Sequence, residues 1–223
     1  MQSLWMVAAS FLFACMGVCV KLAAATFSAP EIVFYRSAIS LLLMIGLMRL
    51  RGIRFATEQI RHQVFRGASG FVSLLLYFYA IAMLPLATAV TLNYTSPIFL
   101  VLYFAAFAGM RLRAGMIVAL VTGFVGVVVL LRPTLQSEQL LGGLLALGSG
   151  VISGLAYFNV RELGARGEPE ARTVFYFSLF ATLCSAAWML LYEFHPVDLH
   201  GGLLLFGVGA FATLAQLCMT RAY

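Results

Sequence analysis

Eight stretches of 17–22 residues carry almost no charged side chains, and short polar clusters separate them. The stretches cover residues 4–25, 32–48, 67–84, 87–108, 115–131, 140–160, 173–192 and 201–220. A helix of about 20 apolar residues spans the hydrocarbon core of a bilayer. The pattern therefore predicts an all-α integral membrane protein with about eight transmembrane helices, and it makes the lipid bilayer a partner of the chain.

The composition agrees with this class and excludes others. Hydrophobic residues make up 63% of the 223 residues and charged residues 10%, whereas soluble domains average about 45–50% and about 25%. These values exclude a soluble globular domain, a disordered chain and a nucleic-acid-binding protein with a basic surface. They also leave the net charge of +6 to be explained.

The positions of the basic residues predict how the chain is oriented. Eleven of the 14 Lys and Arg residues follow the second, fourth, sixth and eighth stretches. The positive-inside rule places those segments and the N-terminus in the cytoplasm, which also explains the net charge without a nucleic-acid partner. No basic residue precedes the first stretch, and Lys21 lies inside it. These features favour a retained first helix over a cleaved signal peptide.

A weak internal repeat recurs at a spacing of 141 residues, where residues 33–37 (VFYRS) match residues 174–178 (VFYFS). The first copy, residues 1–133, holds five stretches, and an odd number of spans inverts the copy that follows. Residues 140–223 hold three stretches. We therefore expect an inverted five-helix repeat whose second copy stops after its third helix.

Several short motifs carry a family resemblance. They are Gly17-x-x-x-Lys21, Pro30-Glu31-x-x-x-Tyr35-Arg36, Leu84-Pro85-Leu86-Ala87-x-Ala89, Asn93-Tyr94-Thr95-Ser96-Pro97 and Gly123-x-x-Gly126-Val127. With them the whole chain resembles the EamA-type branch of the drug/metabolite transporter superfamily. The resemblance implies ten helices in two inverted repeats, a central substrate cavity and a solute carrier of the bacterial inner membrane. Two departures are the missing acidic residue at positions 109–111 and a second repeat that is two helices short.

The fourth stretch contains a polar interruption from Asn93 to Pro97. Proline cannot donate a backbone hydrogen bond, so Pro97 frees the carbonyl of Asn93. Transporters bind solutes at broken helices that line cavities, which makes Asn93 and Pro97 candidate site residues. A simple kink whose polar groups pair with a neighbouring helix is the alternative.

Two further stretches place polar side chains on one helical face at steps of four residues. They are Ser69, Ser73 and Tyr77 in the third stretch, and Ser149, Ser153, Tyr157 and Arg161 in the sixth. Each face is either a cavity wall or a helix–helix contact. Lys21 and Arg36 fall near the extracytoplasmic ends of the first two stretches, where they either reach the interface or attract anions.

These features favour a secondary transporter, and specifically an exporter, of small neutral, zwitterionic or anionic metabolites such as amino acids. The candidate substrate-binding residues are Lys21, Arg36, Tyr77, Tyr79, Asn93, Pro97, Tyr157, Tyr176 and Gln216. A non-transporting or inactive truncated membrane protein is the alternative, and a homo-oligomer that supplies further helices stays open.

An enzyme is not expected, because all eight acidic residues lie in loops or at the ends of stretches and no hydrolase motif or phosphate-binding loop occurs. We expect no cofactor and no metal. The pair His195 and His200 matches no tight zinc spacing, and the four cysteines lie within apolar stretches, where they act as small packing residues.

Overall fold

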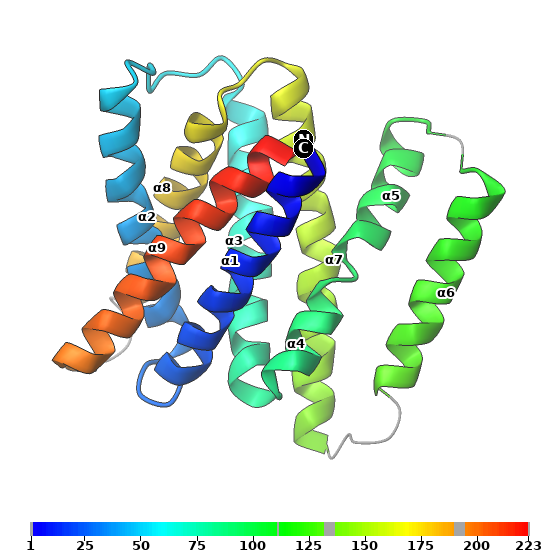
Figure 1. Ribbon diagram of the computed structural model, residues 1–223, viewed down its shortest axis with the longest axis horizontal. Helices are drawn as coiled ribbons and strands as arrows, with labels where there is room; N and C mark the ends of the chain where they lie inside the picture. The colour runs from blue at the N-terminus through cyan, green and yellow to red at the C-terminus, as the bar shows by residue number, and fades with distance from the viewer. Residues whose placement is uncertain (1, 111, 132–136, 190–194, 223) are drawn as a thin grey trace.

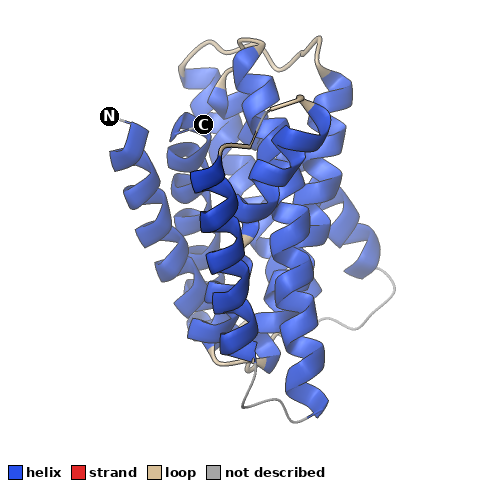
Figure 2. Cartoon of the chain, turned by 90° about the vertical axis from the view of Figure 1, so that its right-hand side faces the viewer, coloured by secondary structure: helices blue, strands red, loops and turns tan. Residues whose placement is uncertain are grey.

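The computed structural model describes residues 2–110, 112–131, 137–189 and 195–222. In this part of the chain all regular elements are α-helices, as predicted (Figure 1, Figure 2). They are α1 (Gln2–Ala23), α2 (Ala29–Leu50), α3 (Ile60–Met83), α4 (Leu86–Asn93), α5 (Ser96–Phe107), α6 (Ala114–Leu131), α7 (Ser137–Ala165), α8 (Glu170–Met189) and α9 (Leu199–Ala222).

Six helical segments are long and apolar enough to cross a membrane, and the pair α4–α5 counts as one of them. Part of α6, Ala114–Gly126, is a shorter apolar helix. The all-helical membrane class is thus confirmed. The number of about eight spans and the internal repeat stay predictions.

Local sequence explains where several helices begin and end. At the start of α2, the backbone N–H and the hydroxyl of Ser28 both donate to Glu31 Oε2, at 2.7 and 2.8 Å. This is one half of a capping box, which satisfies donors at the helix start. Leu84 is extended before Pro85 and ends α3, because the residue before proline is disfavoured in helical conformation.

The fourth predicted stretch is a broken helix. It divides into α4 and α5 at Tyr94 and Thr95, and Pro97 lies in the first turn of α5. Gly150 of α7 makes room for this break, since a Cβ there would lie 2.6 Å from Thr95 Oγ1 and 3.1 Å from the carbonyl oxygen of Leu92. The interruption predicted from the sequence is therefore a real break that packs closely on α7.

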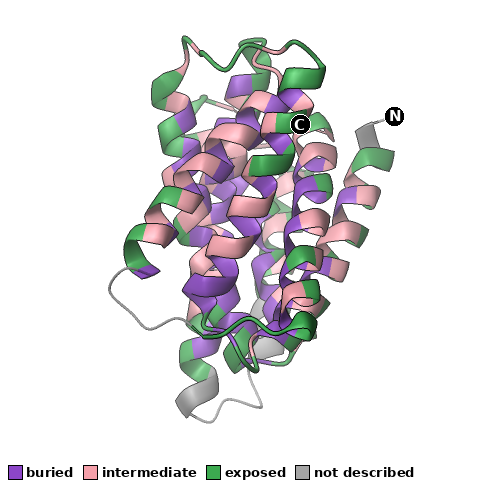
Figure 3. Cartoon of the chain, turned by 90° about the vertical axis from the view of Figure 1, so that its left-hand side faces the viewer, coloured by how far each residue is buried: buried purple, intermediate pink, exposed green. Residues whose placement is uncertain are grey.

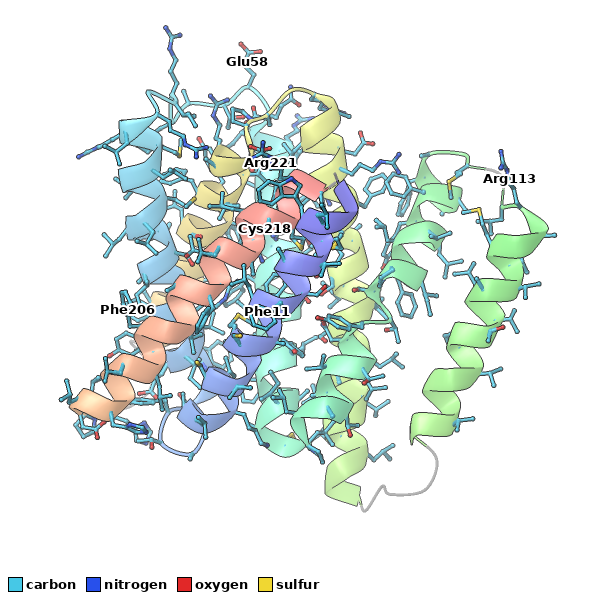
Figure 4. The ribbon with its side chains drawn as sticks, viewed as in Figure 1. Phe11, Glu58, Arg113, Phe206, Cys218 and Arg221 are labelled. Carbon is cyan, nitrogen blue, oxygen red and sulfur yellow. The ribbon has the colours of Figure 1, made fainter. Side chains whose placement is uncertain are left out.

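Three helix pairs form the body of the bundle: α1 packs along α9, α3 along α7 and α2 along α8. Figure 1 shows α5 and α6 to one side of it. Figure 3 shows that buried residues face inward, whereas the outer faces carry exposed ones. Phe11 of α1 and Phe206 of α9 (Figure 4) are 69% and 58% exposed. Exposed apolar residues on this scale suit a lipid environment.

Candidate substrate cavity

A cavity of about 80 Å³ lies inside the bundle, among side chains of α1–α4 and α7–α9, and includes Tyr94 at the helix break. Its polar lining residues are Arg36, Arg66, Ser73, Tyr77, Asn93, Tyr94, Ser153, Tyr157 and Gln216. Phe13, Met16, Leu74 and Phe177 contribute apolar surface. The cavity is therefore a polar enclosure within an otherwise apolar helical bundle.

Five of the predicted site residues line this cavity, namely Arg36, Tyr77, Asn93, Tyr157 and Gln216. They come from five helices that are distant in the sequence. Asn93 ends α4, where its Nδ2 donates to Ser149 Oγ at 2.8 Å. The bond leaves the Asn93 side-chain oxygen as an acceptor for other partners.

The other four predicted site residues lie elsewhere. Lys21 Nζ donates to the carbonyl oxygens of Ile81 and Leu84, at 2.7 and 2.9 Å. It thereby caps the C-terminal end of α3, where cations are favourable. Its contacts are thus those of a residue that joins α1 to α3.

Tyr79, Tyr176 and Pro97 also lie outside the cavity. Tyr79 lines a separate hollow beside Glu31 and His195. The hydroxyl of Tyr176 donates to the carbonyl oxygen of Phe55 at 3.0 Å. Pro97 lies next to the helix break, in the first turn of α5, and shapes the chain beside the cavity without lining it.

The serine faces of α3 and α7 pack against each other at the edge of the cavity. Ser73 Oγ donates to the carbonyl oxygen of Ser149 at 2.9 Å and also hydrogen bonds with the Ser153 hydroxyl. Both Ser73 and Ser153 line the cavity as well. The two interpretations of these faces, helix contact and cavity wall, are therefore both correct for these serines.

Sequence analysis missed Arg66. It was counted among the basic residues that follow the second stretch, because the third stretch was taken to begin at residue 67. The structure begins α3 at Ile60, so Arg66 lies in its second turn and is only 2% exposed. Arg66 continues the face of Ser69, Ser73 and Tyr77 by one turn, and this spacing could have identified it.

Arg66 and Arg36 share an aromatic partner. The guanidinium carbons of Arg36 and Arg66 lie 5.3 and 4.2 Å from the ring centre of Phe177. Phe177 occupies the position that corresponds to Arg36 in the 141-residue repeat, so that spacing was the signal for it. Arg66 Nη2 also donates to Gln216 Oε1 at 3.1 Å.

The arginine pair has no acidic partner among the described residues. The ion pairs found there join Glu162 to Arg166, Glu168 to Arg172 and Glu31 to His195. No acidic side chain lines the cavity. Nε and Nη1 of Arg36 and Nε of Arg66 are buried without a hydrogen-bond partner in the described structure. Both cations thus retain donors that the protein does not use.

The close approach of Arg66 to its own helix requires a glycine. A Cβ at Gly70 would lie 2.0 Å from Arg66 Nη1 and 2.7 Å from Phe177 Cε2. Any larger residue at this position would displace the guanidinium or the ring. Gly70 is therefore part of the cavity geometry although it contributes no functional group.

Comparison with known proteins identifies the family. Residues 1–132 match the EamA-like transporter family. The chain belongs to this family. It is 36% identical over 217 residues to the pseudopaline exporter of Pseudomonas aeruginosa, a match that covers 97% of this chain and 76% of that protein. A riboflavin transporter of Vibrio cholerae is 25% identical over 232 residues, which cover 99% of this chain and 75% of the relative.

A solved crystal structure supports the fold of this EamA-like chain. It has a TM-score of 0.71 and 22% sequence identity, and the match covers 99% of this chain and 78% of that one. Together with the apolar helices, the family assignment establishes a multi-pass membrane protein of the drug/metabolite transporter type. The resemblance found in the sequence motifs is thus confirmed.

Proposed function

We propose that this protein is a secondary transporter that exports small neutral, zwitterionic or anionic metabolites, such as amino acids, across the bacterial inner membrane. The observation that carries the proposal is the enclosed polar cavity with two buried arginines. Buried ionisable groups within a membrane bundle are costly and commonly mark solute pathways. The names of the relatives, a pseudopaline exporter and a riboflavin transporter, support transport of small solutes.

The transport step is movement of the two repeats, residues 1–133 and 140–223, around the cavity. The packing pattern supports this part of the proposal. A spacing of about 140 residues relates α1 to α7, α2 to α8 and α3 to α9. A two-fold relation therefore exchanges the contact α1–α9 with α3–α7 and maps the contact α2–α8 onto itself, and these are the three pairs that form the bundle.

The small volume of the cavity agrees with a closed conformation. Binding sites for drug-sized ligands typically have volumes of about 300–1,000 Å³, whereas this cavity has about 80 Å³. A whole metabolite needs more space than this. Entry of the solute therefore requires that the helices around the cavity separate, as in transporters that work by rocking or gating of repeats.

The orientation is also part of the proposal. The N-terminus and the loop at residues 51–59 are expected in the cytoplasm. Single cysteines at Glu58 and Val197, which are both exposed, in a background without the four native cysteines would test this. An impermeant thiol reagent added to intact cells should label Val197→Cys and not Glu58→Cys, and the reverse labelling would invert the orientation.

Flux measurements test transport itself. Proteoliposomes containing the purified chain should show counterflow of at least one member of a panel of amino acids, pseudopaline and riboflavin. Asn93→Leu should abolish this flux, while Thr122→Leu should preserve it. Thr122 is an exposed residue of α6 whose hydroxyl bonds only within its helix, to the carbonyl oxygen of Val118.

Two results would count against the proposal. Absence of flux for the whole panel would favour a non-transporting or inactive membrane protein. Unchanged flux in Asn93→Leu, with normal membrane insertion, would remove Asn93 from the site.

A further inference from the structure

We propose that Arg36 and Arg66 form a receptor for an oxyanion group, a carboxylate or a phosphate, of the transported solute. The inference rests on the proposed transport function and narrows its substrate class. It assigns the charged group of the solute to the space beside Phe177, between α2, α3 and α8. Asn93 and the two tyrosines, Tyr77 and Tyr157, would then contact the rest of the solute.

The first argument is the missing counter-charge. Arg36 and Arg66 are 1% and 2% exposed, and both guanidinium groups approach the same ring. A cation–π contact stabilises each group but carries no net negative charge. Two buried like charges also repel each other. Removing two charges from water is unfavourable unless an opposite charge and hydrogen bonds compensate, and no described side chain supplies that charge.

The second argument is the set of unused donors. Three guanidinium nitrogens, Nε and Nη1 of Arg36 and Nε of Arg66, are buried without a partner among the described residues. Guanidinium groups present their N–H donors in a planar fork that matches the oxygens of carboxylates and phosphates. Gln216 holds the remaining side of Arg66 through its Oε1, which fixes the orientation of this fork.

The third argument is a contrast with another arginine of the same chain. Arg161 lies 4.4 Å from the ring centre of Phe104, a stacking distance close to that of Arg66 on Phe177. Arg161, however, is exposed and does not line the cavity. Stacking on an aromatic ring is therefore not in itself the unusual feature. The unusual feature is enclosure of two such cations beside a space that one small anionic group can enter.

Binding of a matched pair of probes tests the inference. The purified chain in lipid nanodiscs is titrated with glutarate and with glutaramide, which have the same skeleton but carry carboxylates or amides. Inorganic phosphate forms a third arm, and chloride at equal ionic strength is the salt control. Ligands that bind the folded state raise the unfolding temperature, so the titrations yield apparent dissociation constants.

Glutarate or phosphate, but not glutaramide, should stabilise the protein. In Arg36→Gln and Arg66→Gln the apparent affinity should fall about tenfold or more, because charge-assisted hydrogen bonds are lost. Arg161→Gln should bind as the unmodified chain does. A response to glutarate alone assigns a carboxylate, and a response to phosphate alone assigns a phosphate. Arg66→Lys, which retains the charge but not the fork, should bind more weakly than the unmodified chain.

Equal stabilisation by glutarate and glutaramide, or no stabilisation by either oxyanion, would overturn the inference. So would unchanged affinity in both glutamine variants. If these variants do not fold, the comparison of glutarate with glutaramide on the unmodified chain still decides. The outcome is separable from the proposed function, because transport of a neutral member of the panel would uphold transport while the oxyanion receptor fails.

Discussion

The middle and the ends of this helical bundle place charge in opposite ways. At one end, which we call the basic end, the loops at residues 51–59 and 166–169 meet. Buried Glu168 there accepts hydrogen bonds from Thr57 Oγ1 at 2.6 Å and from Arg172 Nη1 at 3.2 Å. At the opposite end, Glu31 accepts hydrogen bonds from Ser28 and His195.

In the middle, two buried arginines have no acidic partner among the described residues. The acidic groups at the ends therefore join loops within the protein. The cations in the middle retain donors for a group that comes from outside. This contrast predicts that substitutions at the ends change stability, whereas substitutions in the middle change transport.

The largest effect is expected from Arg66→Met. Loss of this cation should lower the transport of anionic solutes by about 100-fold or more, because breaking a buried charged contact costs about 2–5 kcal/mol. The midpoint of thermal unfolding should stay the same or rise, since replacing a buried charge by an apolar side chain is often neutral or stabilising. Arg161→Met is the matched control and should change flux little.

A strong fall in the unfolding midpoint of Arg66→Met, together with unchanged flux per folded molecule, would reverse this assignment. Arg66 would then be a structural residue like Glu168.

Glu168→Ala should produce the largest loss of stability at either end. It leaves the buried donors of Thr57, Gln63 and Arg172 without their acceptor, and unsatisfied buried groups cost about 1–3 kcal/mol each. Thermal unfolding in detergent measures the effect. Glu162→Ala is the control in the same region, because its pair with Arg166 is partly exposed and exposed pairs contribute only about 0–1 kcal/mol.

If Glu162→Ala and Glu168→Ala shifted the midpoint equally, burial of Glu168 would not be the cause of its contribution.

Gly70→Ala changes the middle without removing a functional group. Its added Cβ would collide with Arg66 Nη1, so the guanidinium must move. We expect transport to fall about tenfold, because misplacing a binding group by about 1 Å is enough to lose most of its benefit. Gly46→Ala in α2 is the control, as a Cβ there meets no atom within 4 Å. Equal flux in the two variants would show that the position of Arg66 is not critical.

The smallest effect is expected from His195→Ala. The imidazole of His195 is 52% exposed, and its backbone N–H, which donates to Glu31 Oε1 at 2.8 Å, survives the substitution. The midpoint of thermal unfolding should therefore fall by an amount that corresponds to less than about 1 kcal/mol. A loss as large as that of Glu168→Ala would mean that both ends depend equally on a single side chain.

The parts of the fold that local sequence determines were predictable. Long uncharged stretches located the helices, and the proline at position 97 located the break between α4 and α5. Arg66 was missed because a basic residue was taken as the boundary of a span, although a helix can bury a cation beside a cavity. The contacts of Lys21 could not be predicted, since its carbonyl partners lie about 60 residues away in the sequence.

A structure of the chain with a transported solute or glutarate bound tests the central claim most directly. An oxygen of the acidic group should lie about 3 Å from Nε or Nη1 of Arg36 or from Nε of Arg66, beside Phe177. An acidic group directed away from both arginines would contradict the account. Binding in the apolar groove between α5 and α6, which Leu102 and Phe124 line, would contradict it as well.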